Sequence, residues 1–154
     1  MPHIHEKIDF TADVFVVHKG RVLIRKHDKY GIWLAVGGHV ELHEDPNEAA
    51  IREVKEEMGL DVKLYGTREY REDTENYKEL IPPVYMNRHD ITPHHEHISL
   101  VYFATSDSDT IVNEGREASK NARWFTKDEL EGNEYPEIKP SIRFYALKAL
   151  EVLG

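Results

Sequence analysis

The chain has 154 residues, no cysteine and a formal net charge of −9 at pH 7. Its length fits one domain of ordinary size, and the lack of cysteine excludes disulfides and thiolate chemistry. The acidic balance argues against long nucleic acid as a partner, because phosphate backbones are bound by basic surfaces. We therefore expect a single domain over residues 1–154, and a metal cation as intermediary if this acidic chain handles phosphate.

Signals for export or membrane insertion are lacking. The N-terminal stretch MPHIHEKIDF has no apolar core of the kind found in signal peptides. The longest apolar runs, such as residues 100–104, are far shorter than the roughly 20 residues that cross a bilayer. We expect a cytoplasmic protein with no membrane partner.

The first elements in chain order are strands. Residues 10–17 and 21–26 are rich in β-branched and apolar side chains, and residues 18–20 between them are typical of a hairpin turn. A third short apolar run covers residues 33–36 and ends at a pair of glycines. These patterns predict the beginning of a sheet.

Residues 46–58 have the apolar period of a helix and clear end signals. Asp45 is the predicted N-cap, and Glu48 completes a capping box with it. Pro46 occupies the first helical position, and Gly59 ends the helix.

The second half of the sequence has a more uneven pattern. Residues 61–71 alternate loosely and predict a strand, whereas residues 72–95 are polar and contain prolines, which favours a loop. Residues 97–104 are apolar enough for a central strand covered on both faces. Residues 105–121 have the composition of a loop.

The last part of the chain returns to regular structure. Residues 123–126 predict a short strand, and residues 127–130 a single helical turn. An amphipathic helix follows, because apolar residues recur at helical spacing. They are Ile142, Tyr145, Ala146, Ala149, Leu150 and Leu153. Strands with helices placed between them predict an α/β fold with a mixed sheet packed between helices.

The helix at residues 46–58 carries a cluster of acids, although like charges at this spacing destabilise a helix by about 0.2–0.5 kcal/mol per pair. Successive residues turn by about 100°, so Ile51, Val54 and Met58 should face the core. We expect the acids to share a neighbouring, exposed face. They are Glu53, Glu56 and Glu57. Such a face is either solvated surface or a site for a hard divalent cation such as Mg²⁺.

The spacing around this cluster resembles a known signature. From Gly38 the sequence has five residues, Glu44, seven residues, and then REVKEEMGL from Arg52 to Leu60. This pattern resembles the Nudix box of the MutT-like hydrolases, with every defining position filled. The resemblance implies the Nudix α/β/α sandwich, in which the box forms a catalytic loop–helix–loop.

The resemblance also implies an activity. Nudix hydrolases typically cleave a diphosphate linkage with Mg²⁺ or Mn²⁺ bound at the phosphates. The implied substrate is a small nucleotide or nucleoside diphosphate derivative, such as a nucleoside triphosphate, an ADP-ribose-like compound or a dinucleoside polyphosphate. We keep a non-catalytic Nudix ligand-binding module as the alternative. Relatives often form homodimers, but nothing in the sequence indicates an interface.

The family's residue roles carry over by position. Glu53 is implied to be a metal ligand or the general base, Arg52 to orient Glu53, and Glu44 to act as an orienting residue before the helix. The remaining implied metal ligands are Glu56, Glu57 and the carbonyl oxygen of Gly37.

Two further groups of residues are implied to lie at the site. Gly38 and His39 are expected near the substrate's phosphates. Many relatives add one acid from outside the box, and the candidates here are Glu114, Glu117 and Glu96. We favour the loop that holds the first two, because loops that face a metal site often carry function.

Ten histidines are present, and four lie close together in sequence: His89, His94, His95 and His97. Such clusters can bind metal, but Mg²⁺ does not seek imidazole. A substrate contact or a hydrated loop is the favoured interpretation, and a second, histidine-based metal site is the alternative.

Overall fold

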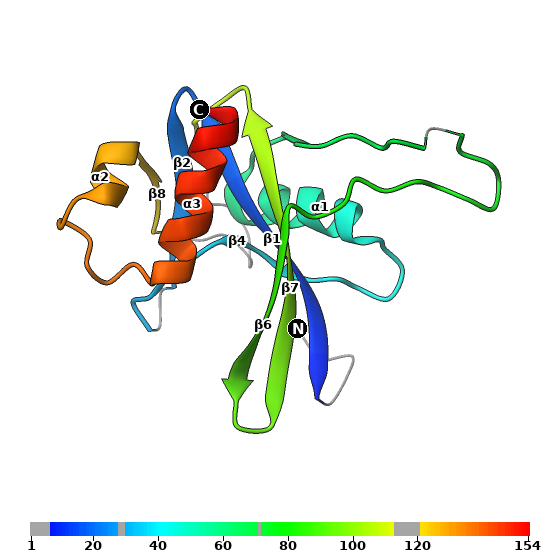
Figure 1. Cartoon of the computed structure of the whole chain (residues 1–154), viewed down its shortest axis with the longest axis horizontal. Helices are drawn as coiled ribbons and strands as arrows, with labels where there is room; N and C mark the ends of the chain where they lie inside the picture. Colours follow the sequence, from blue (N-terminus) through cyan, green and yellow to red (C-terminus); the bar gives the residue numbers. More distant parts are fainter. Residues whose placement is uncertain (1–6, 28–29, 71, 113–120) are drawn as a thin grey trace.

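In the described part of the chain, eight strands form one mixed sheet that lies between helices (Figure 1). This computed structural model describes residues 7–27, 30–70, 72–112 and 121–154. The predicted α/β fold with a mixed sheet between helices is confirmed within these ranges.

The longest strands lie at the centre of the sheet. Strand β1 (Ile8–His18) pairs in parallel with β7 (His95–Ser106) along most of its length. It also pairs antiparallel with β2 (Arg21–Lys26) and with β4 (Val36–His39). Because β1 touches three strands, it connects the glycine pair of β4 to the histidine-rich start of β7.

Shorter strands complete the sheet on either side. Strands β3 (Trp33–Leu34) and β8 (Ala122–Phe125) both pair with β2. Strands β5 (Val62–Leu64) and β6 (Tyr85–Thr92) both pair with β7. The predicted hairpin turn between β1 and β2 is confirmed: the two residues between the strands both have positive φ, as in the tight turns that suit strand twist.

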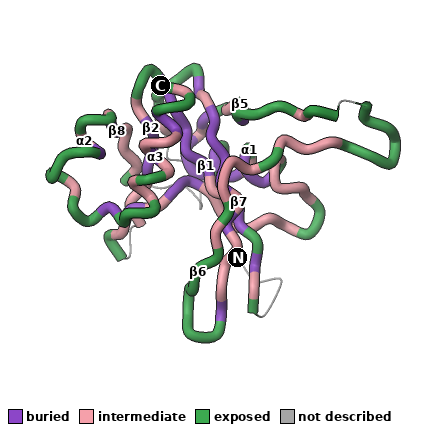
Figure 2. Tube along the Cα trace, viewed as in Figure 1, coloured by how far each residue is buried: buried purple, intermediate pink, exposed green. Residues whose placement is uncertain are grey.

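The helices cover the two faces of the sheet. Helix α1 (Pro46–Met58) contacts β1, β4 and β5, and helix α3 (Pro140–Leu153) contacts β1, β2 and β7. The short helix α2 (Lys127–Glu131) lies beside α3. Apolar side chains fill the space on both faces, and the buried part of the chain in Figure 2 is concentrated where the helices cross the sheet. In the described residues, no helix combines the length and apolar character needed to cross a membrane.

The predicted signals around α1 are confirmed. The Asp45 side chain accepts a hydrogen bond of 2.8 Å from the backbone N–H of Glu48, whose carboxylate accepts one of 3.2 Å from the N–H of Asp45. Gly59 closes the helix in the left-handed conformation at φ 70°. The ends of this helix are therefore fixed by local chemistry.

The prediction for residues 72–95 was wrong in its second half, where β6 forms a hairpin with β7. The strand was missed because it lies at a sheet edge with most side chains exposed, so the hydrogen bonds of the ladder hold it without an apolar pattern. The strand predicted over residues 61–71 is confined to Val62–Leu64.

Candidate active site

Two glycines bring the backbone of β4 close to its neighbours. A Cβ atom on Gly37 would lie 2.1 Å from the carbonyl oxygen of Ala12, and Gly37 has a φ of 153°. A Cβ on Gly38 would lie 2.5 Å from a carboxylate oxygen of Glu53. Only glycine therefore allows β4 to pass between β1 and the acidic side of α1.

Arg52 joins the acids of α1 to the preceding loop. Its Nε and Nη2 donate hydrogen bonds of 2.9 and 2.6 Å to the two carboxylate oxygens of Glu44. Its Nη1 donates to Glu53 at 2.9 Å and to Glu56 at 3.1 Å, and its Nη2 also reaches the carbonyl oxygen of His39 at 3.1 Å. Paired, charged bonds of this kind fix both partners in direction and position.

The same contacts change the acidity of the two partners. The pKa of the Arg52 guanidinium is raised, chiefly by its hydrogen bonds with Glu44. Burial would raise the pKa of Glu44, but the bonds from Arg52 and from the backbone N–H of Glu41 outweigh it and lower the pKa. Arg52 and Glu44 therefore stay ionised at neutral pH.

The prediction of one exposed face for the three acids is confirmed for Glu56 and wrong for the other two. Glu53 and Glu57 are buried, with 5% and 4% of their surface exposed, whereas Ile51 is 43% exposed. The prediction centred the core stripe on Ile51, Val54 and Met58 and put Ala50 only at its margin. The buried side is instead centred on Ala50 and Val54, and β4 contributes glycine backbone there, which leaves room for carboxylates.

Burial has a strong effect on the two inner carboxyl groups. Burial, with a smaller contribution from the neighbouring Glu53, raises the pKa of Glu57 to about 8, and the attraction of Arg25 opposes this rise. Burial also raises the pKa of Glu53, although Arg52 opposes it. Two such groups in contact share a proton instead of both ionising, unless a cation joins them.

The donor set fits a hard divalent cation. Oxygen Oε2 of Glu57 is buried, and no group in the described residues donates a hydrogen bond to it. The Nε of Arg25 lies 3.1 Å away, but it donates its hydrogen to the carbonyl oxygen of Ala35. An ionised oxygen in this position lacks a donor, and Mg²⁺ prefers such carboxylate oxygens.

Other residues predicted for the site lie around this cluster or apart from it. Gly37 makes a backbone hydrogen bond to the Glu57 carboxylate. The ring of His39 turns toward Asp9, with 3.5 Å between Nε2 and Oδ2. Glu96 is ion-paired with Arg88. The position on β1 that pairs with Glu96 lies five residues, about 16 Å, from the position that pairs with Gly37. Glu114 and Glu117 lie outside the described residues.

Arg25 also lies at the site, although the sequence did not predict it there. Its Nε approaches Glu57, and its charge lowers the pKa of that carboxyl group. A signal was present, because side chains alternate along a strand and Arg25 follows Leu23 by two positions. Leu23 packs in the core beneath α1, so Arg25 had to point to the same face.

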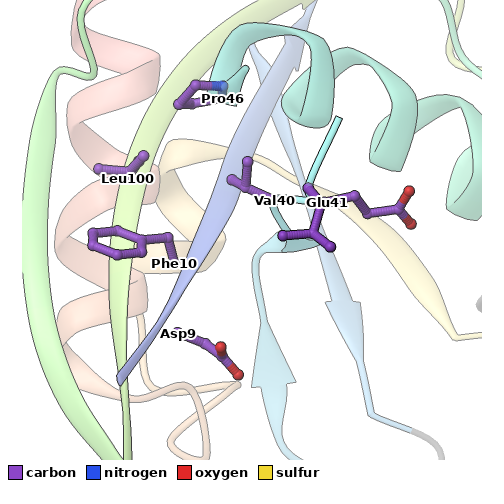
Figure 3. Close-up of a pocket in the computed structure, with 7 residues that line it drawn as sticks. Asp9, Phe10, Val40, Glu41, Pro46 and Leu100 are labelled. Carbon is purple, nitrogen blue, oxygen red and sulfur yellow. The ribbon is translucent and has the colours of Figure 1, made fainter. Parts of the chain in front are cut away.

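A groove of about 450 Å³ adjoins the cluster (Figure 3). Its walls are mainly apolar, and Phe10 and Leu100 lie on neighbouring strands opposite Val40. Glu41 connects the groove to the acids, because its carboxylate lies 3.9 Å from Arg52 and its N–H donates to Glu44. A ligand in the groove would therefore lie next to the loop that orients the acids.

The chain is similar to known proteins in both sequence and structure. A family model described as the NUDIX domain matches residues 8–147. A NUDIX-family hydrolase from Clostridium perfringens has 37% sequence identity, and its crystal structure matches over 95% of this chain and 98% of that chain with a TM-score of 0.85.

More distant structures share the fold. A MutT NUDIX hydrolase from Burkholderia pseudomallei has 21% identity over 97% of this chain and 100% of that chain, with a TM-score of 0.65. An ADP-ribose pyrophosphatase from Streptococcus suis has 14% identity over 94% and 90%, with a TM-score of 0.57. At these identities the likeness shows the fold alone.

Proposed function

The chain belongs to the NUDIX family of hydrolases, and from this premise we propose that it hydrolyses a diphosphate linkage in a small nucleotide or nucleoside diphosphate derivative. We further propose Mg²⁺ or Mn²⁺ as its cofactor. The observation that carries the proposal is the buried Glu57 oxygen without a hydrogen-bond donor, which lies against a second buried carboxyl group.

We propose roles for the acids that follow the family pattern, and the contacts of Arg52 support them. Glu56 and Glu57 would hold the ion, with Glu53 as a third ligand or as the general base for the attacking water. Arg52 would orient Glu53, and Glu44 would in turn hold Arg52. When bound, the ion polarises phosphoryl oxygens and lowers the pKa of coordinated water.

The apolar groove supports a substrate with a sizeable non-phosphate part. Phe10 is 44% exposed and lines the groove, where its ring could contact a base or another flat group. A buried diphosphate at the acids and an apolar contact at Phe10 would together orient the scissile bond. The ADP-ribose pyrophosphatase among the fold neighbours makes ADP-ribose a reasonable member of the first substrate panel.

Turnover of a nucleotide panel tests the proposed function. The purified chain with Mg²⁺ should release orthophosphate, pyrophosphate or a nucleoside monophosphate from at least one compound, and EDTA should stop the release. If one compound binds tightly and none is hydrolysed with either Mg²⁺ or Mn²⁺, the chain is a ligand-binding module instead.

Phe10→Ala should raise KM about threefold to tenfold with kcat nearly unchanged, since removing an exposed apolar contact loses about 1 kcal/mol of binding shared by ground and transition states. Steady-state kinetics on the best panel substrate measures both constants. Phe144→Ala is a matched control, because that ring has similar exposure, 48%, and lies on α3. Equal KM for both variants would exclude the groove as the binding site.

A further inference from the structure

Four strands bring together a second group of side chains of the types that can bind metal. The parallel register of β1 and β7 sets Asp9 opposite His97, and the antiparallel register of β6 sets His89 opposite His97. His95 lies two positions before His97 and points to the same face, while His39 comes from the end of β4. We call these five residues the histidine cluster.

The cluster is compact and partly buried. The ring of His97 has centroid distances of 4.9 Å to His39, 5.2 Å to His95 and 5.8 Å to His89. Asp9 is 2% exposed and His95 is 8% exposed. Imidazoles crowded around a buried carboxylate are costly to assemble for a purely structural purpose, because each polar group loses water.

The ligand atoms lie close to the spacing that tetrahedral coordination of a metal ion requires. The available atoms of Asp9, His95 and His97 all lie within 4.8 Å of one another. Oδ2 of Asp9 lies 3.2 Å from Nε2 of His95 and 3.5 Å from Nε2 of His39. Bonds of about 2.0–2.2 Å to a tetrahedral Zn²⁺ place neighbouring ligand atoms roughly 3.3–3.6 Å apart. Only small side-chain movements would therefore close the site.

We propose that the histidine cluster binds a transition-metal ion of the Zn²⁺ class, with Asp9, His95 and His97 as ligands. Imidazole nitrogen and carboxylate oxygen suit Zn²⁺, whereas Mg²⁺ prefers oxygen alone. His39 supplies a fourth nitrogen next to the same Asp9 oxygen.

This site is distinct from the acids of α1. Asp9 lies four positions along β1, about 13 Å, from Asp13, which pairs with Gly37. Figure 1 shows that the β6–β7 hairpin and the first part of β1 extend together beyond the helices. The two sites differ in donor type, so each can be occupied without the other.

Zinc titration in the presence of excess Mg²⁺ tests the proposal, because Mg²⁺ keeps the carboxylate cluster occupied. Calorimetry on the metal-stripped full chain should give one Zn²⁺ per chain. His95→Asn and His97→Asn should each weaken Zn²⁺ binding at least tenfold. His94→Asn is the matched control: this neighbour is exposed in the hairpin turn, and its replacement should change affinity less than twofold.

Two further measurements distinguish a loss of zinc binding from a loss of folding. Thermal unfolding of each variant without zinc shows whether the variant folds. If His95→Asn does not fold, His97→Asn replaces it in the test, because His97 is less buried than His95. Cobalt substitution adds a spectroscopic signature, because tetrahedral Co²⁺ absorbs far more strongly than octahedral Co²⁺. The proposal is overturned if the parent chain binds no Zn²⁺ in excess Mg²⁺. It is equally overturned if Glu56→Gln with Glu57→Gln removes zinc binding while folded His95→Asn retains it.

Discussion

Glu57→Gln is expected to reduce kcat about 10³-fold, because metal clamping contributes several kcal/mol to the transition state and each 1.36 kcal/mol is about tenfold in rate. Gln keeps the shape of the side chain but replaces an ionisable oxygen with an amide. In the proposed site that oxygen is the buried one without a donor, so no other group in the described residues replaces it. Steady-state turnover at saturating Mg²⁺ measures the effect.

The substitution should leave the fold intact. Burial already keeps Glu57 largely protonated in the metal-free chain at neutral pH, since its pKa is about 8. A neutral amide therefore resembles the carboxyl group that the fold accommodates. Glu151→Gln on the exposed side of α3 is the matched control and should change kcat less than twofold. If Glu57→Gln keeps more than about a tenth of the parent rate, the assignment of Glu57 as a metal ligand is wrong.

Local signals explain why much of the fold could be predicted. The ends of α1 depend on Asp45, Glu48 and Gly59. Each of these residues interacts with a partner only three or four positions away in the sequence. The spacing of acids in the same segment is a sequence property and led to the family directly. Strand β6 was missed because its stability comes from hydrogen bonds to β7 and not from its own composition.

Long-range pairing explains what the sequence could not predict. Asp9 and His97 are neighbours only because β1 and β7 run in parallel, and no local pattern specifies that pairing. The burial of Glu57 likewise depends on the glycine backbone of β4 lying against α1 and on Arg25 arriving from β2. A helical projection of α1 alone placed this carboxylate on the surface.

The stability of the metal-free chain is expected to fall as pH rises from about 6.5 to 8. Burial raises the pKa of Glu57 from 4.5 to about 8, so the folded chain retains a proton that the unfolded chain has released. Stability therefore falls by about 1.4 kcal/mol per pH unit, or about 2 kcal/mol over this window. For a chain of this size the midpoint of thermal unfolding should drop by roughly 4–8 °C.

Between pH 6.5 and 8, the titration of His97 contributes little to the change in stability. Burial lowers the pKa of His97 to about 4, so its contribution to stability grows as pH rises and is complete once the unfolded-state value of 6.5 is passed. Scanning calorimetry in EDTA between pH 6.5 and 8 thus isolates the carboxyl pair on α1. Arg25 and Glu53 are the charged groups next to Glu57. Arg52 joins Glu53 to Glu56 through ion pairs.

Mg²⁺ should restore the stability that the metal-free chain loses as the pH rises. A cation that binds the ionised acids of the folded chain competes with the retained proton, so its stabilising effect should be larger at pH 8 than at pH 6.5. Glu57→Gln removes the proton and the ligand together and should flatten both the pH slope and its Mg²⁺ dependence. A parent chain whose unfolding midpoint stays level across the window, with Mg²⁺ giving the same increase at both ends, would show that Glu57 is ionised before any cation arrives. The acids would then be neutralised by Arg25 and Arg52 alone, without a retained proton.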